Sequence, residues 1–381
     1  MKIERAVLRE IGLELREPFR TRRGTVQHRR ILLLTLEGEG LEGWAECVAG
    51  VDESVPETVD TAWRALEEGL LPRVVGREVT RPEEVLSWGS GLGDQRMALA
   101  AVEMAAWDLK ARAEGVSLAR KLGGERSSVD VGVSIGLQAS DARLEEVVAG
   151  YLAAGYARVK IKIEPGRDVE MLTRVGERFP GVRLWADANA AYTLADAPRL
   201  RELDALGLGL LEQPLAASDF EGHARLQEML TTPVCLDESI ASEADARRAV
   251  ELGACRVVNL KPGRVGGLTE SLRIHDLLCA AGIPVWCGGM LESGIGRAHN
   301  LALASLPGFT LPGDISASRR YWVQDIVTPE FEIVAGRMAV PSAPGIGVAV
   351  DLERVRALTV REAVVSTPSA HARAGRRHQG Q

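Results

Sequence analysis

Five ionisable residues and a tryptophan recur through the middle of the chain at a nearly constant interval of about 25 residues. Steps of 25, 25, 25, 24 and 25 residues join Lys162, Asp187, Glu212, Asp237, Lys261 and Trp286. One strand, one helix and their two connecting loops occupy about this length in a β/α barrel. Because the strand ends of such a barrel converge on one mouth, the spacing predicts that these side chains face a common centre.

A short apolar run leads up to or spans each of these positions, without the alternation of a half-exposed strand. The runs are Val159–Ile163, Val182–Ala186, Leu208–Leu211, Val234–Leu236, Val257–Leu260 and Ile283–Cys287. Continuous apolar runs of this length are typical of parallel strands that are buried on both faces. Glycines such as Gly207 and Gly253 come shortly before the runs, where each would end the preceding helix. We therefore expect a (β/α)8-type barrel, that is, a modified TIM barrel, over residues 126–320.

The rest of the chain does not follow this rhythm. Residues 1–125 contain three strand-like segments and a helical one, Met97–Ala113, which together predict an α+β capping domain. The strand-like segments are Lys2–Leu8, Ile31–Gly38 and Gly43–Glu46, with a hairpin turn at 38–40. A polar hinge at 123–128 precedes Val129–Ile135, which is expected to be the first barrel strand. Short apolar segments over 321–365 are expected to return to the capping domain, and 366–381 to be a disordered tail.

Composition argues against several classes of function. The formal net charge is −7 and no basic stripe is present, which argues against nucleic acid as a partner. No run approaches the roughly 20 apolar residues that cross a bilayer, and the charged N-terminal residues lack the apolar core of a signal peptide. The five cysteines are scattered, so we expect free thiols in a reducing compartment and a cytoplasmic protein.

Three carboxylates at consecutive strand ends predict a metal site. Asp187, Glu212 and Asp237 offer only oxygen ligands, which favour Mg²⁺ first and Mn²⁺ second. No histidine falls at any of the repeat positions, which argues against zinc. Lys162 precedes the carboxylates and Lys261 follows them, so in a barrel the two amines would lie on opposite sides of the metal.

This arrangement suits removal of the proton α to a carboxylate. A metal beside the substrate carboxylate stabilises the enediolate that forms when this weakly acidic proton leaves. Burial and neighbouring cations lower the pKa of catalytic lysines toward about 7–8, which makes a neutral amine available as the base. One lysine could remove the proton from one face and the other could return it to the opposite face, which gives racemisation. With a leaving group on the β-carbon, the same intermediate gives elimination.

Five short motifs resemble those of the enolase superfamily, in its muconate-lactonizing-enzyme subgroup. They are Lys160-Ile161-Lys162, Asp187-Ala188-Asn189, Glu212-Gln213-Pro214, Asp237-Glu238-Ser239 and Lys261-Pro262-Gly263-Arg264-Val265-Gly266-Gly267. The stretch from Trp286 to Asn300, and Arg264, are similar to the N-acylamino acid racemase/o-succinylbenzoate synthase group. The resemblance extends to about residue 365 and implies a barrel whose capping domain is formed by the N-terminal part and the C-terminal segment.

The resemblance also implies roles for individual residues. Lys162 and Lys261 match the acid/base pair, and Lys160 matches a lysine that neutralises the substrate carboxylate. Asn189 and Glu238 match residues that support the metal ligands from behind. The candidate substrate contacts are Lys160, Ser134, Asn189, Gly289, Met290, Glu292, Arg264, and Phe19 in a capping-domain loop, with the loop around Cys47–Asp52. Arg264 could instead pair with a carboxylate such as Glu292.

The implied reaction is racemisation of N-acylamino acids, together with dehydration to o-succinylbenzoate, a menaquinone precursor. Three alternatives stay open: the synthase reaction alone, a dipeptide epimerase or muconate-type cycloisomerase, and a non-catalytic barrel that chelation of Mg²⁺ would leave unaffected. Gly313-Asp314-Ile315-Ser316 stands where dipeptide epimerases usually carry Asp-x-Asp, which disfavours that reaction. Relatives are commonly dimers or octamers, so we expect a homo-oligomer that acts on a small-molecule carboxylate.

Overall fold

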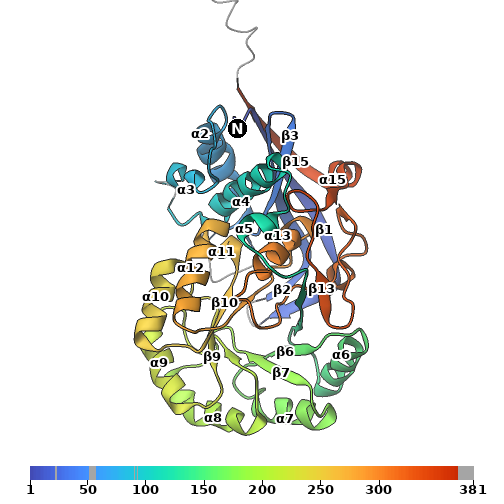
Figure 1. The fold of residues 1–381 in the computed structure, drawn as a ribbon. Coiled ribbons are helices and arrows are strands. Elements are labelled where there is room, and N and C mark those ends of the chain that lie inside the picture. Colours follow the sequence, from blue (N-terminus) through green and yellow to red (C-terminus); the bar gives the residue numbers. More distant parts are fainter. Residues whose placement is uncertain (22–23, 51–56, 90, 92, 368–381) are drawn as a thin grey trace, which may run out of the picture.

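The capping region is built on a four-stranded antiparallel sheet (Figure 1). The computed structural model describes residues 1–21, 24–50, 57–89, 91 and 93–367 of the 381-residue chain. The strand order is β15-β1-β2-β3, with β1 at Arg5–Thr21, β2 at Gly24–Gly38, β3 at Leu41–Cys47 and β15 at Thr359–Ser366. The C-terminal strand therefore lies beside the N-terminal one. Residues 368–381, most of the expected tail, lie outside the described part of the chain.

The first two strands are longer than the sequence predicted. β1 and β2 pair from Arg5 opposite Glu37 as far as Thr21 opposite Gly24, with a register shift between Glu14 and Phe19. The expectation of a capping-domain loop at Phe19 is therefore wrong, because this residue lies in the β1–β2 ribbon. The hairpin turn at 38–40 between β2 and β3 is confirmed.

Six helices lie in the described part of the N-terminal region. They are α1 (Val59–Arg64), η1 (Ala65–Leu70), α2 (Leu71–Val74), α3 (Glu84–Trp88), α4 (Arg96–Ala113) and α5 (Leu118–Leu122). The predicted helix at Met97–Ala113 is confirmed as α4, which lies across β3 and β2. Gly43 makes this close approach possible, because a Cβ at this position would lie only 2.5 Å from Leu109 Cβ.

The barrel contains a seven-stranded parallel sheet with consecutive strand order, as predicted. The strands are β5 (Val133–Ile135), β6 (Arg158–Lys162), β7 (Arg183–Asp187), β8 (Leu211–Glu212), β9 (Val234–Leu236), β10 (Val257–Leu260) and β11 (Val285–Cys287). Parallel bridges from Phe309 to Val285 and from Gly313 to Val131 bring the segment 309–313 into the eighth position. The sheet thus curls into a barrel that this segment closes.

Helices cover the outside of this barrel (Figure 1). They include α6 (Asp141–Ala153), α7 (Val169–Arg178), η2 (Leu194–Asp196), α8 (Ala197–Arg201), η3 (Glu202–Leu206), α9 (Phe220–Met229), α10 (Glu243–Leu252) and α12 (Leu268–Ala280). Three more helices face the capping region: α11 (Pro262–Val265) contacts α4, α13 (Gly294–Ala304) contacts β3, and α14 (Ser318–Tyr321) contacts β1. Gly253 ends α10 in the left-handed region at φ +66°, which glycine adopts without steric cost. At the start of α10, Ser242 Oγ accepts from Asp245 N at 3.2 Å and caps the first turn.

The expected first barrel strand divides into two pieces. β4 (Ser128–Asp130) pairs antiparallel with β13 (Arg337–Ala339), and only β5 belongs to the barrel sheet. A Cβ at Gly132, between the two pieces, would meet the buried Arg158 guanidinium, so this position has no room for a side chain. The remaining C-terminal elements are β12 (Val327–Thr328), β14 (Ala349–Val350) and α15 (Leu352–Leu358).

Aromatic side chains fill the inside of the barrel. Trp185 and Trp286 lie edge to face with ring centroids 5.3 Å apart, and both are almost fully buried. Trp286 also donates to Cys235 Sγ at 3.3 Å. The barrel is therefore a filled core with a site at its mouth, not a pore. No helix in the described part of the chain is long and apolar enough to cross a membrane.

Candidate active site

A cavity of about 140 Å³ lies between the barrel mouth and the end of the β1–β2 ribbon. Its lining comes from at least six barrel strands or strand ends and from both strands of the ribbon. The lining residues are Phe19, Gly24, Thr25, Val26, Ser134, Lys160, Lys162, Asp187, Asn189, Asp237, Glu238, Lys261, Gly289, Met290, Leu291, Asp314 and Tyr321. The pocket is thus polar at its floor, and it is closed by side chains of the capping region.

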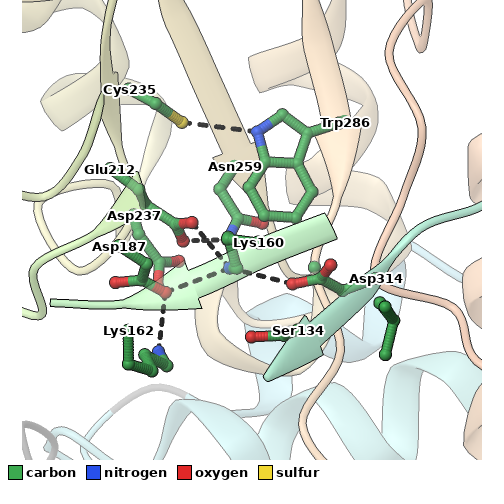
Figure 2. A network of polar contacts seen from close by, with 12 residues as sticks. Ser134, Lys160, Lys162, Asp187, Glu212, Cys235, Asp237, Asn259, Trp286 and Asp314 are labelled. Carbon is green, nitrogen blue, oxygen red and sulfur yellow. Dashed lines mark hydrogen bonds and ion pairs between the residues drawn. The ribbon is translucent and has the colours of Figure 1, made fainter. Parts of the chain in front are cut away.

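β6 contributes a row of cations to this floor because alternate residues of a strand point to the same face. Arg158, Lys160 and Lys162 follow one another at this spacing. Lys160 Nζ lies 2.6 Å from Glu212 Oε2, 3.0 Å from Asp187 Oδ2 and 2.8 Å from Asp314 Oδ2. Figure 2 shows this ammonium in the middle of the three carboxylates.

Burial and neighbouring charges act in opposite directions on this cluster. Burial by itself would lower the pKa of Lys160, but Asp314, Glu212 and Asp187 outweigh it and raise this pKa well above its usual range. Burial, reinforced by the charges of Asp187 and Asp237, raises the pKa of Glu212 to about 8, although Lys160 opposes the shift. Five ionisable groups therefore form one tightly interacting unit.

The two predicted acid/base lysines hold equivalent places at opposite strands of this floor. Lys162 Nζ, on β6, donates to Asp187 Oδ2 at 2.6 Å and to Asn189 Oδ1 at 2.5 Å. Lys261 Nζ, just after β10, donates to Asp237 Oδ2 at 2.8 Å. Each amine is thus held by a carboxylate that the sequence predicted to be a metal ligand.

Further polar side chains hold these carboxylates and the strand ends that carry them. Arg264 Nη1 lies 2.5 Å from Asp237 Oδ1. Burial by itself would raise the pKa of Asp237, but the charges of Arg264 and Lys261 hold this pKa well below its usual range. Gln213 Oε1 accepts from the backbone N–H of Asp237 at 2.9 Å and so fixes the end of the next strand. Asn189 Nδ2 donates to Glu238 Oε1 at 3.0 Å.

The donor set fits a hard dication. Asp187, Glu212 and Asp237 are at most 1% exposed, they end adjacent strands, and they offer only oxygen. The Lys160 ammonium already lies between two of them, so this position attracts a cation. As the described side chains stand, no group of three or more His, Cys, Asp or Glu residues is gathered closely enough to hold a metal ion, since lysines lie against these carboxylates.

The structure brings most of the predicted site residues together. Eleven of them line the cavity: Phe19, Ser134, Lys160, Lys162, Asp187, Asn189, Asp237, Glu238, Lys261, Gly289 and Met290. Glu212 lies beneath the floor, where it contacts Lys160 and Asn259. Of the predicted loop at Cys47–Asp52, residues 51 and 52 lie outside the described part of the chain.

Two predicted substrate contacts lie elsewhere. Glu292 is buried, and its Oε1 accepts from Asn300 Nδ2 at 2.9 Å, so the carboxylate is directed toward α13 and is not part of the described cavity lining. Arg264 is also outside that lining, because its guanidinium lies against Asp237. For Arg264 the structure therefore favours the alternative role, a pairing with a carboxylate, and the partner is Asp237.

Several lining residues were not identified from the sequence. Asp314 lines the cavity and lies 28 residues after Trp286, close to one further step of the 25-residue rhythm. Arg158 lies beneath the floor, two residues before Lys160, where strand alternation could have identified it. Thr25 and Val26 come from the β1–β2 ribbon, and Tyr321 comes from α14. These three carry no signal in the sequence, because only the tertiary arrangement brings them to the barrel mouth.

Comparison with known proteins agrees with this geometry. Residues 3–123 match the mandelate racemase/muconate lactonizing enzyme N-terminal domain, and residues 143–355 match the enolase C-terminal domain-like family. The chain is 50% identical over 364 residues to an o-succinylbenzoate synthase of Geobacillus stearothermophilus, covering 94% of this chain and 96% of that protein. It is also 50% identical over 370 residues to an N-succinylamino acid racemase of Thermus thermophilus, covering 96% of this chain and 100% of that protein.

A solved structure shares the whole architecture. The crystal structure of an enolase superfamily member from Listeria innocua superposes with a TM-score of 0.92 at 42% sequence identity, covering 96% of this chain and 99% of that one. The two family domains, the curled parallel sheet and the carboxylates at consecutive strand ends all agree. The chain is therefore an enzyme of the mandelate racemase/muconate lactonizing enzyme family, within the enolase superfamily.

Proposed function

We propose that this protein uses Mg²⁺ to remove the proton α to the carboxylate of an N-acylamino acid, racemising it, and that it also dehydrates a cyclohexadiene carboxylate to o-succinylbenzoate. The observation that carries the proposal is the placement of two lysines, Lys162 and Lys261, on strands either side of a carboxylate floor. The names of the two relatives at 50% identity favour N-succinylamino acids and o-succinylbenzoate as the compounds concerned.

The charges of the site support a dianionic reaction intermediate. Five carboxylates, Asp187, Glu212, Asp237, Glu238 and Asp314, lie with five cations, Lys160, Lys162, Lys261, Arg158 and Arg264. A bound dication would add positive charge to this cluster and so stabilise the negative charge that develops on a substrate carboxylate.

Each lysine has a defined part in this reaction. Lys162 and Lys261 approach the cavity from different strands, so each serves one face of the α-carbon, one as base and the other as acid. Asp187 and Asn189 orient the Lys162 amine, while Asp237 orients that of Lys261. In the syn elimination one lysine takes the α-proton and returns it to the hydroxyl on the same face, which leaves as water. The other lysine can act as a cation there. Phe19 and Val26 of the ribbon cover the cavity and exclude water.

Substitution of each lysine tests the two-base arrangement. Exchange of the α-proton for deuterium in heavy water would be followed by NMR for each enantiomer of an N-succinylamino acid. Lys162→Ala should abolish exchange from one enantiomer and Lys261→Ala from the other, with racemisation lost in both. Lys110→Ala, which removes a lysine paired with Glu114 on the surface of α4, is the matched control. Full racemase activity in either active-site variant would exclude the two-base mechanism.

Metal dependence separates an enzyme of this kind from a non-catalytic barrel. Dialysis against a chelator should remove both racemase and synthase activity, and added Mg²⁺ should restore them, with Mn²⁺ as a second choice. Activity that survives complete removal of divalent ions would contradict the proposed role of Asp187, Glu212 and Asp237. Absence of any turnover with metal present, on both substrates, would contradict the proposed reactions.

A further inference from the structure

A buried chain of charges runs from beneath the barrel floor to the predicted metal ligands. Arg158, which is 0% exposed, places Nη1 2.5 Å from Asp314 Oδ1. The other oxygen of Asp314 lies 2.8 Å from Lys160 Nζ, which in turn contacts Glu212 and Asp187 (Figure 2). Asp314 is therefore the one carboxylate of these three that is not among the predicted metal ligands.

Arg158 cannot easily move, and this fixes Asp314. Its guanidinium lies over Trp185 with Cζ 4.2 Å from the ring centroid, and Nη2 donates to Pro312 O at 2.7 Å. Lys160 Nζ lies 4.7 Å from the centroid of the Trp286 ring, so the barrel core also blocks a retreat of this ammonium. Lys160 Nζ is therefore confined between the Trp286 ring and the carboxylates of Asp187, Glu212 and Asp314.

A dication and the Lys160 ammonium need the same carboxylate oxygens. Glu212 Oε2 and Asp187 Oδ2 would serve a metal, yet both lie within 3.0 Å of Nζ. Two cations at such close range repel strongly in a buried site, because the local dielectric constant is low. A partner that holds the ammonium away from the metal ligands would reduce this cost, and Asp314 is the carboxylate in the right place.

We propose that Lys160 competes with the dication for Asp187 and Glu212, and that Asp314, fixed by Arg158, is the positioning residue that holds the ammonium when the dication binds. The inference rests on the proposed metal site. It assigns a role to Asp314 and Arg158 that does not require either to touch substrate.

A double-mutant cycle on metal binding tests this without measuring turnover. The Kd for Mg²⁺ would be measured by isothermal titration calorimetry, with Mn²⁺ as a second probe, on the full-length protein. Lys160→Met should tighten binding about tenfold, since a competing cation is lost. Asp314→Asn should weaken binding about tenfold. In the Lys160→Met background, the effect of Asp314→Asn should shrink to less than about threefold, because no ammonium remains to be held.

The controls separate this role from general effects on charge and folding. Asp314 also attracts a dication directly, but that attraction would be the same in both backgrounds, so additive effects in the cycle would overturn the proposal. An unchanged Kd in Lys160→Met would overturn it as well. Asp314→Glu retains the charge and should keep Kd within about threefold of the parent value. If Asp314→Asn does not fold, the smaller Asp314→Ser replaces it.

A second buried aspartate provides the matched control. Asp325 is 2% exposed and faces Arg297 at 3.2 Å, as Asp314 faces Arg158. Asp325→Asn should therefore lower the melting temperature without changing the Kd for Mg²⁺. If the unaltered protein binds no Mg²⁺ at all, the proposed function fails. If it binds Mg²⁺ but the cycle is additive, only the present inference fails.

Discussion

A glutamate of the capping region, Glu103, is expected to determine how firmly this region holds the barrel. Glu103 lies on α4 and is 0% exposed. It accepts from the backbone N–H groups of Leu268 and Thr269 at 2.8 Å each, and so caps the first turn of α12. Trp107 Nε1 also donates to it, at 2.6 Å. A single carboxylate thus joins the capping helix to the barrel helix that follows the Lys261 loop.

Glu103→Ala leaves two backbone donors buried without an acceptor. Each unsatisfied buried donor costs about 1–3 kcal/mol, so we expect the free energy of unfolding to fall by about 2–6 kcal/mol. The indole of Trp107 is less affected, because it also lies 3.2 Å from Thr269 Oγ1. This loss is large compared with a typical total stability of about 5–15 kcal/mol. Urea unfolding followed by circular dichroism would measure it.

The chain offers a closely matched control for this substitution. Trp63 Nε1 donates to Glu67 at 2.6 Å with the same four-residue spacing as Trp107 and Glu103, but Glu67 is only half-buried. Glu67→Ala should cost less than about 1 kcal/mol, since water can replace the carboxylate. A loss below about 1 kcal/mol in Glu103→Ala as well would refute the argument that this carboxylate is required at the domain boundary.

Three further outcomes follow from the structure. Burial raises the pKa of Glu46 to about 7, so folding favours the protonated carboxyl. The free energy of unfolding should therefore fall by up to about 3 kcal/mol as pH rises from about 4.5 to 7, and Glu46→Gln should remove this part of its pH dependence, as measured by urea unfolding. Mg²⁺ at 100 times its Kd should raise the free energy of unfolding by about 2.7 kcal/mol, an effect that Asp237→Asn should largely remove. A Cβ at Gly288 would lie 2.5 Å from Lys261 Cε, so Gly288→Ala should displace this lysine. Proton exchange should then slow for one enantiomer at least about tenfold more than for the other. Gly176→Ala, in open space on α7, should not have this effect.

The 25-residue rhythm was sufficient to predict the barrel because each strand end carries a polar residue after an apolar run. The strands at Val234–Leu236 and Val257–Leu260 have the predicted bounds, and the others differ by a few residues. Val129 was misassigned, since an apolar run does not show which of two sheets a strand joins. The length of the β1–β2 ribbon was missed for a similar reason: alternation of Ile11, Leu13 and Leu15 with exposed residues continues beyond the expected end.

The floor of the site was more predictable than its walls. Strand periodicity and register determine where the side chains of β6 to β10 point, so a repeat in the sequence is enough to place Lys162 beside Asp187. The walls depend on contacts between segments far apart in sequence, such as Phe19 of the ribbon and Tyr321 of α14. Glu292 was predicted to contact substrate but lies outside the described lining, and its partner, Asn300, is recognisable only once α13 is in place.

This division between floor and walls has a consequence for specificity. The proton-transfer groups stand on barrel strands, while Phe19, Thr25 and Val26 belong to a ribbon whose distance from the floor depends on how the capping region docks. Docking is set by buried carboxylates: Glu46 accepts from Ser293 N at 2.9 Å at the start of α13, as Glu103 does at α12. Neither carboxylate belongs to the cavity lining. The side chains of the ribbon, and with them the acyl group of the proposed substrate, can therefore differ without disturbing the lysines or the carboxylates beneath them.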